Sequence, residues 1–234
     1  MNLFFLQVLI DSAKIKDSLA RVVLTAAQQK ESLWDILFKG GPLMIPLAIL
    51  LVIAIFVFFE RLMAIRKASK LDDNFMNIIK DHIVTGNVTA ARSLAKNTPT
   101  SVAKIIDKGI QRIGKPIEAI ERSMENVGKL ELYNMERNLS ILSVIGYIAP
   151  LFGFLGTIAG MFQLFYSIAS TGEYSIANIA GGIYVKMISS ASGLIIGIIA
   201  YVGYRYLNSQ IDKTTNKMEV ASAEFIDVLQ EPTR

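Results

Sequence analysis

The chain has 234 residues, of which 52% are hydrophobic and 19% are charged, and its formal net charge is +4. Globular domains carry about 25% charged residues; here the charge is missing from long apolar blocks, which indicates membrane spans. The weak, scattered net charge argues against nucleic-acid binding. The absence of cysteine and the single histidine exclude disulfides, thiolate catalysis and a zinc site built from such ligands.

The N-terminal segment, residues 1–41, opens with an apolar run over residues 1–10. This run is too short to cross a bilayer, which takes about 20 residues. It also lacks the basic start and the small-residue cleavage site of a signal peptide. We therefore expect an amphipathic segment that stays on the protein and lies at the membrane surface.

The first predicted span is residues 42–60. No charged residue occurs between Leu43 and Phe59, and Gly40, Gly41 and Pro42 form a natural entry turn. Pro46 falls in the first turn, where a helix tolerates proline.

Residues 61–138 are predicted to form a helical domain. Apolar residues recur there at spacings of three and four, and charges of both signs occupy the other positions. Pro99 and the stretch 114–116 (GKP) mark breaks between helices. Residues 118–138 are rich in charge but contain no breaker, so this stretch is predicted to continue straight into the next span.

Two longer apolar blocks follow, predicted as spans over residues 139–169 and 176–207. The link between them, residues 170–175, has no basic residue, whereas residues 61–138 are rich in lysine and arginine and the stretch after the third span, with the tail at residues 208–234, carries Arg205, Lys213 and Lys217. Basic residues favour the cytoplasmic side. The prediction is therefore a cytoplasmic domain and C-terminal tail, with the link and the N-terminus outside.

The last two spans are rich in small and hydroxyl-bearing residues. Gly156 with Gly160, and Gly193 with Gly197, have the spacing that lets two helices approach closely. Each helix also has one stripe of residues that recur at spacings of three and four and therefore share a face. The stripe in the second span is Pro150, Gly153, Thr157 and Gly160. The stripe in the third span is Lys186, Ser190, Gly193 and Gly197, and Ser189 and Ser192 widen it. Such faces suit a narrow polar lumen or a groove for a partner helix. Alternatively, the hydroxyls bond only to backbone carbonyls of their own helix.

Lys186 lies roughly ten residues inside the third span. A lysine in lipid costs about 2.5–3.5 kcal/mol on insertion scales, so it is expected to face protein or water and to have a partner. No acidic residue lies deep enough in the last two spans, and Glu173 belongs to the outer link. Either the counter-charge comes from another chain, or Lys186 extends to the outer interface.

Three stretches of the sequence resemble the MotA/TolQ/ExbB proton-channel family, and within it ExbB. These are residues 34–42 (WDILFKGGP) with 59–62 (FERL), residues 149–157 (APLFGFLGT), similar to the family's APLLGLLGT block, and residues 182–194 (GIYVKMISSASGL). The likeness extends over nearly everything from about residue 32 onward.

The resemblance implies an all-α integral membrane protein of the bacterial inner membrane, assembled as a pentamer around a central pore. Two copies of an ExbD-like single-span protein would occupy the pore, and a TonB-like partner would receive the energy of proton flow. Thr157 and Ser190 correspond to pore-lining hydroxyls of the family. By this alignment Val185 stands where the family commonly has a glutamate on the third span. Either the alignment slips locally, or the subunit has no intramembrane acid of its own and the proton-carrying carboxylate belongs to the partner.

Other functions remain open from the sequence. A TolQ-like subunit or a gliding or flagellar stator would belong to the same family, and a non-conducting membrane scaffold would belong to another class. An enzyme is disfavoured because the sequence offers no recognisable nucleophile–base pair, and no cofactor is expected.

Overall fold

The computed structural model describes residues 40–72, 74–172 and 176–230, and all regular secondary structure in these ranges is α-helical. The predicted N-terminal segment lies outside the described residues except for Gly40 and Gly41, and so does Glu173 of the link. The helices are α3 (Met44–Ser69), α4 (Phe75–Val84), α5 (Val88–Asn97), α6 (Ser101–Ile110), α7 (Ile117–Glu136), α8 (Leu139–Thr171) and α9 (Ile176–Gln230).

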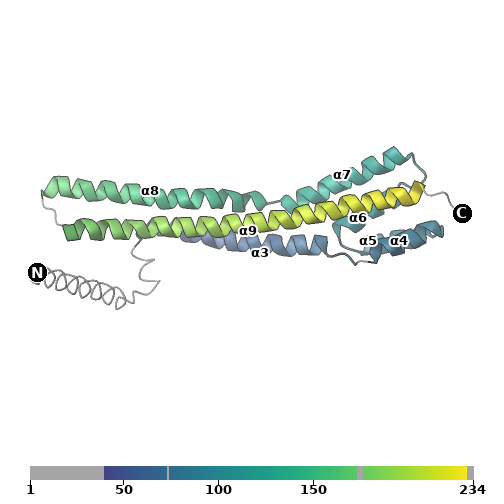
Figure 1. Ribbon diagram of the computed structural model, residues 1–234, viewed down its shortest axis with the longest axis horizontal. Coiled ribbons are helices and arrows are strands. Elements are labelled where there is room, and N and C mark those ends of the chain that lie inside the picture. Colours follow the sequence, from purple (N-terminus) through teal and green to yellow (C-terminus); the bar gives the residue numbers. More distant parts are fainter. Residues whose placement is uncertain (1–39, 73, 173–175, 231–234) are drawn as a thin grey trace, which may run out of the picture.

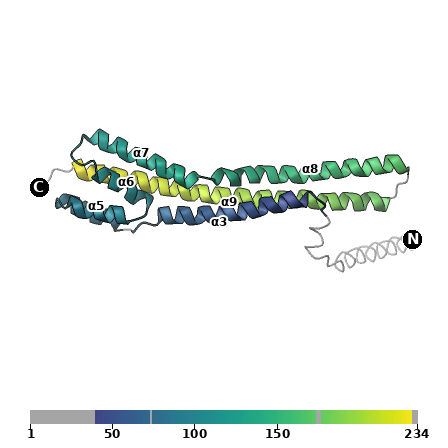
Figure 2. The same ribbon diagram turned by 180° about the vertical axis from the view of Figure 1, so that it is seen from behind.

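The molecule is an elongated bundle in which α9 runs almost the whole length (Figure 1). Helix α8 lies along one half of α9, α3 lies along its middle part, and α4 to α7 gather around its other half, near the C-terminus. The view from behind shows the same division (Figure 2). We call α4 to α7, together with α9 beyond Leu207, the helical domain.

Three helical stretches are long and apolar enough to cross a membrane: Met44–Ser69, Ile117–Thr171 and Ile179–Gln230. Their outward faces carry large apolar side chains, including Val52, Phe56 and Phe162, which are 66%, 68% and 73% exposed. In water such faces would be unfavourable, whereas in lipid they are ordinary. The predicted all-α architecture with three spans is therefore confirmed.

The start of α3 follows from its sequence. Gly41 has a positive φ of 80°, the backbone N–H of Met44 donates to the carbonyl of Gly41 at 3.0 Å, and Pro46 lies in the first turn. The end of the apolar block is fixed by Arg61, which is buried, pairs with Glu60 and donates to the carbonyl of Asn134 at 3.3 Å. Arg61 thereby ties α3 to the end of α7.

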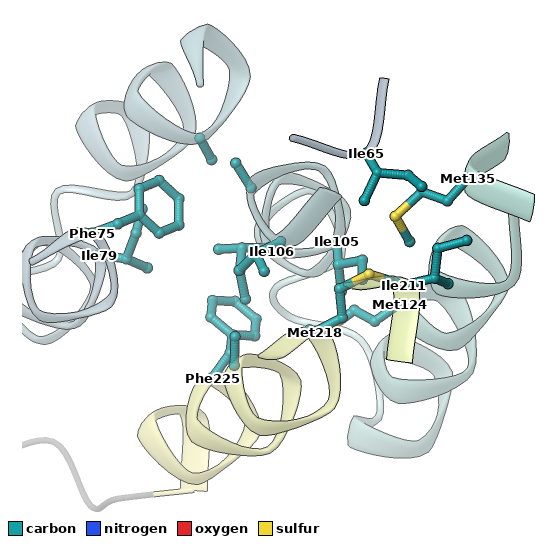
Figure 3. Packing of buried hydrophobic residues seen from close by; sticks show 14 of the residues in the cluster. Ile65, Phe75, Ile79, Ile105, Ile106, Met124, Met135, Ile211, Met218 and Phe225 are labelled. Atoms are coloured by element: carbon teal, nitrogen blue, oxygen red, sulfur yellow. The ribbon is translucent and has the colours of Figure 1, made fainter. Parts of the chain in front are cut away.

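The core of the helical domain is built on α9. Residues at alternating spacings of four and three along this helix are all buried: Leu207, Ile211, Thr214, Met218, Ala221 and Phe225. Figure 3 shows three of them, Ile211, Met218 and Phe225, among the buried side chains of the other helices: Ile65 of α3, Phe75 and Ile79 of α4, Ile105 and Ile106 of α6, and Met124 and Met135 of α7. Residues 208–230 are therefore not a separate tail, as the sequence boundary at 207 implied, but the continuation of α9.

The junction between α7 and α8 also differs from expectation. The charged helix was predicted to run uninterrupted into the second span, but α7 ends at Glu136 and α8 begins at Leu139. Between them Asn138 has a φ of 63°, a left-handed conformation that asparagine tolerates better than most residues. This single residue redirects the chain without any proline or glycine.

One charged cluster lies inside the helical domain. The carboxylate of Glu131, on α7, is mostly buried; it accepts a hydrogen bond from the hydroxyl of Ser101 at 3.0 Å and pairs with the Lys104 ammonium at 2.8 Å. Both partners belong to α6. Because a buried carboxylate is stable only when its oxygens are satisfied, this cluster fixes how α7 lies against α6.

Candidate functional site

Helices α8 and α9 pack antiparallel, backbone against backbone. A methyl group at Gly193 would come within 2.5 Å of the Ala149 carbonyl oxygen and 2.9 Å of the Gly153 Cα. Across the contact, a methyl group at Gly153 would lie 3.0 Å from the Cα of Ser190. No side chain fits at either position, so the two helices approach as closely as glycine allows. We call the stretch formed by residues 149–160 and 186–197 the α8–α9 contact.

Pro150 and Gly197 belong to the inner end of this contact. Proline has no N–H to give to the carbonyl of Gly146, one turn earlier. That carbonyl oxygen lies 2.9 Å from where a Cβ of Gly197 would be, and the Pro150 ring lies 2.6 Å from the same point. The missing side chain at Gly197 therefore makes room for both the proline ring and the carbonyl that the proline leaves without its helix partner.

Two further glycines of α8 make room for side chains of α9. A methyl group at Gly156 would be 2.7 Å from the Ser189 hydroxyl oxygen. A methyl group at Gly160 would overlap the alkyl chain of Lys186. Lys186 therefore lies across α8, in the groove that the missing side chain of Gly160 leaves open.

The hydroxyl groups bond to their own helices. Thr157 is half-buried and donates to the carbonyl of Phe154 at 2.6 Å. Ser189 is 1% exposed and donates to the carbonyl of Lys186 at 3.0 Å. The alternative in which the hydroxyls serve backbone carbonyls is thus observed for both residues. Each oxygen still has lone pairs with which it can accept a hydrogen bond from another donor.

Lys186 is half-buried, and no carboxylate of residues 40–72, 74–172 or 176–230 forms an ion pair with it. It is the single ionisable cation in the apolar part of the two helices, since the next basic residue on α9 is Arg205. A cation held in this position by a glycine groove is prepared for a negative partner.

The structure divides the predicted site residues into two groups. Pro150, Gly153 and Ser189 were predicted to line a polar pathway but lie inside the α8–α9 contact, alongside the packing glycines 156, 160, 193 and 197. Thr157, Ser190 and Lys186 stay half-buried at its edge. The reason is geometric: each small-residue face is covered by the other helix, so within one chain it encloses no lumen.

Sequence reasoning missed the dependence of Lys186 on Gly160. Gly160 had been assigned only to helix packing, as one of a pair of glycines. It also makes room for a long side chain, that of Lys186, from the facing helix. Only the antiparallel register of the two helices, which the sequence does not state, brings these residues opposite each other.

Three apolar helices long enough to span a membrane, a glycine-lined contact and a helical domain at one end define this chain as a multi-span membrane subunit. Residues 97–220, more than half of the chain, match the MotA/TolQ/ExbB proton channel family. The chain belongs to this family.

Similar proteins include ExbB and TolQ relatives. An ExbB homolog of Methanothermobacter thermautotrophicus is 26% identical over 183 residues, covering 78% of this chain and 65% of the relative. The biopolymer transport protein exbB1 of Vibrio cholerae is 35% identical over 88 residues, covering 37% of this chain and 39% of the relative. The TolQ protein of the Tol-Pal system of Pseudomonas aeruginosa is 22% identical over 214 residues, covering 85% and 92%.

The chain spans less than two thirds of the length of each of the first two relatives. The family match covers α6, α7, α8 and most of α9.

Proposed function

We propose that this chain is an ExbB-like subunit of an inner-membrane motor driven by protons. The observation that carries the proposal is Lys186: a half-buried cation in an apolar helix, held by Gly160, with no carboxylate partner in the described part of the chain. A cation in this environment is stable when a negative group lies nearby. In our proposal this group is a carboxylate on a helix of another protein.

The proton pathway runs along the edge of the α8–α9 contact. A carboxylate on the partner helix takes up a proton on one side of the membrane and releases it on the other. Thr157 and Ser190 face this helix. Their hydroxyls donate to the carboxylate when it is charged, and for this Thr157 turns its hydroxyl away from the Phe154 carbonyl. Lys186 stabilises its charged form, while Pro150, Gly153, Ser189 and the four packing glycines keep the two helices in register.

The assembly follows the family. Five copies of this chain surround the pore, two ExbD-like single-span chains occupy it, and a TonB-like protein carries the resulting motion to outer-membrane transporters. The helical domain contains many lysines and arginines whereas the link at residues 170–175 contains none, which supports a cytoplasmic domain and C-terminus. The same distribution also supports a periplasmic N-terminus and a periplasmic link between α8 and α9.

The first test is the composition of the complex. The chain is co-expressed with an ExbD-like single-span protein, solubilised in mild detergent and weighed by native mass spectrometry. We expect five copies of this chain with two of the partner. A monomer, or an assembly without the single-span partner, would contradict the motor.

The second test is proton flux in liposomes that contain this complex and a pH-sensitive dye. We expect Thr157→Ala and Ser190→Ala to slow flux about 10- to 100-fold each, because an unsolvated carboxylate is harder to charge in an apolar pore. Ser143→Ala, another half-buried hydroxyl of α8 but outside the pathway, is the matched control and should retain normal flux. Unchanged flux in both pathway variants would favour a non-conducting scaffold.

Lys186→Met tests the residue on which the proposal rests. Methionine keeps the alkyl chain over Gly160 and removes the charge, so packing is preserved. We expect flux to fall with the complex still intact by native mass spectrometry. Normal flux in Lys186→Met would remove Lys186 from the pathway. Val185→Glu, tested beside it, restores the acid that relatives have on this span.

A TolQ-like subunit is the second candidate, favoured by one observation. The TolQ relative is matched over 85% of this chain and 92% of its own length, a fuller alignment than either ExbB relative gives. The two functions differ in the partner. Co-purification with the single-span protein of a Tol-Pal system, rather than with an ExbD-like protein, would decide for the TolQ-like subunit.

A further inference from the structure

A small pocket lined by both polar and apolar side chains lies where α3 and α9 leave the apolar part of the bundle. Its volume is about 140 Å³, and its polar lining consists of Arg66, Ser69 and Lys70 from α3 and its C-cap, with Tyr206 and Gln210 from α9. The charge-free block of α3 ends at Phe59, and Arg205 is the first charged residue of α9 after Lys186. The pocket therefore begins about one turn beyond the apolar spans, at the depth of the lipid headgroups.

The lining of the pocket is positively charged. Arg66 and Lys70 are exposed, and neither forms an ion pair with a residue of the described ranges. No carboxylate lines the pocket. One guanidinium group, one ammonium group, a serine and a tyrosine hydroxyl and an amide together make a set of donors suited to a phosphate group.

An apolar path leads from this pocket toward the middle of the spans. On α3, Ile55 and Phe59 lie on the same face as Leu62, the apolar lining residue nearest the membrane; they are 46% and 56% exposed. On α9, Ile199 and Val202 lie above Tyr206 and are 51% and 59% exposed. Each helix thus presents an exposed apolar strip that adjoins the pocket on the side of the membrane spans.

We propose that this pocket binds the headgroup of an anionic phospholipid from the leaflet on the side of the helical domain. The phosphate is held by Arg66 and Lys70 with hydrogen bonds from Tyr206 and Ser69, and the acyl chains follow the apolar strips of α3 and α9. Continuity between pocket and strips argues for a lipid over a free anion. Basic pockets between spans on the cytoplasmic side are known to take such headgroups. The site lies apart from Lys186, so its test leaves the proposed proton pathway untouched.

The experiment measures lipid retention by the intact, detergent-purified protein in native mass spectrometry. Dioleoyl-phosphatidylglycerol and dioleoyl-phosphatidylcholine are titrated in parallel, and we expect the anionic lipid to bind more tightly. The variant R66Q/K70Q should bind the anionic lipid about 30-fold more weakly, the effect of losing two basic residues at an anionic surface. Its affinity should then approach that for phosphatidylcholine.

The variant K67Q/R205Q is the matched control. It removes one lysine and one arginine at the same depth, both exposed and neither lining the pocket, so it should change the affinity less than about threefold. All four side chains are exposed, and an unchanged melting temperature verifies that the variants fold.

Three results would overturn the proposal. Equal binding of the two lipids would remove the charge selectivity, and equal losses in the two double variants would reduce it to diffuse surface charge. Displacement of the lipid by an equal concentration of free glycerol phosphate would identify the pocket as a site for soluble anions instead. Failure of glycerol phosphate to compete supports the lipid.

Discussion

Two regions of this molecule are held together in opposite ways, although α9 runs through both. In the α8–α9 contact, glycines bring one backbone against the other, and a single added methyl group would collide with a carbonyl oxygen. In the helical domain, large side chains such as Phe225, Met124 and Ile106 fill the space between helices. Between Gly197 and Leu207, α9 therefore changes from packing through close backbone contact at glycines to packing through large apolar side chains.

The difference follows from the surroundings of each half. In water, burying a large apolar side chain contributes about 1.5–3 kcal/mol to the stability of the fold, so a core of such residues stabilises the helical domain. In lipid that gain vanishes because the solvent is as apolar as the side chain, and close backbone packing takes its place. Large apolar residues on α8 and α9 accordingly face outward, where Phe162 is 73% exposed.

The largest effect should come from emptying the domain core. Phe225 is 1% exposed and lies against Gly109 and Met124, so Phe225→Ala leaves a cavity and should cost about 3–5 kcal/mol. Hydrogen-exchange mass spectrometry should show faster exchange in α4, α6 and α7. Exchange in α8 should stay unchanged; loss of protection there as well would mean that the two regions fold as one cooperative unit.

A smaller effect is expected when the α8–α9 contact is forced apart. In Gly193→Ala the new methyl group meets the carbonyl of Ala149 and the backbone of Gly153, which cannot rotate away. We expect a loss of about 1–3 kcal/mol from overpacking, measured as a lower melting temperature in detergent.

Gly181→Ala provides the control for this variant. Gly181 lies on the same helix with nothing within 4 Å of the added methyl group, so alanine should be neutral or stabilise the helix by up to about 1 kcal/mol. Equal melting temperatures for the two variants would show that the glycines of the contact are not needed for close packing.

The smallest effect on stability is expected for Gly160→Ala. Its methyl group meets only the flexible alkyl chain of Lys186, which can move aside, so the cost should stay below about 1 kcal/mol. The position of the amino group should change, however, and an amine-reactive reagent should label Lys186 at a different rate. An unaltered labelling rate would show that Gly160 does not position Lys186.

Much of the fold could be predicted because spans and breaks leave local signals. The charge-free block before Glu60 predicts α3, and Pro99 and Pro116 fall between helices as expected. The continuation of α9 to Gln230 was also encoded, in the alternating spacing of Leu207, Ile211, Thr214, Met218, Ala221 and Phe225. It was overlooked because the charged residues between them suggest a solvated tail.

Other features depend on contacts that a sequence does not specify. Asn138 breaks the helix between α7 and α8 without a proline or glycine, at the point where the chain passes from one helix packed on α9 to another. In the site, the small residues of both spans were recognised, but the sequence left open whether they face a lumen or a helix. The antiparallel register decides this for Gly153 and Ser189, and it sets Lys186 against Gly160.

The unbroken course of α9 has a mechanical consequence. From Gly193 in the α8–α9 contact to Phe225 in the domain core, the helix rises about 48 Å without a cap or a left-handed residue. The neighbouring path through α8 and α7 is interrupted at Asn138, where the helix breaks. A twist applied to α9 inside the bilayer must therefore arrive at Phe225 as a twist, while the path through α8 and α7 can bend and absorb it. Helix α9 thus transmits a rotation along the molecule, and α8 supports it without transmitting the rotation.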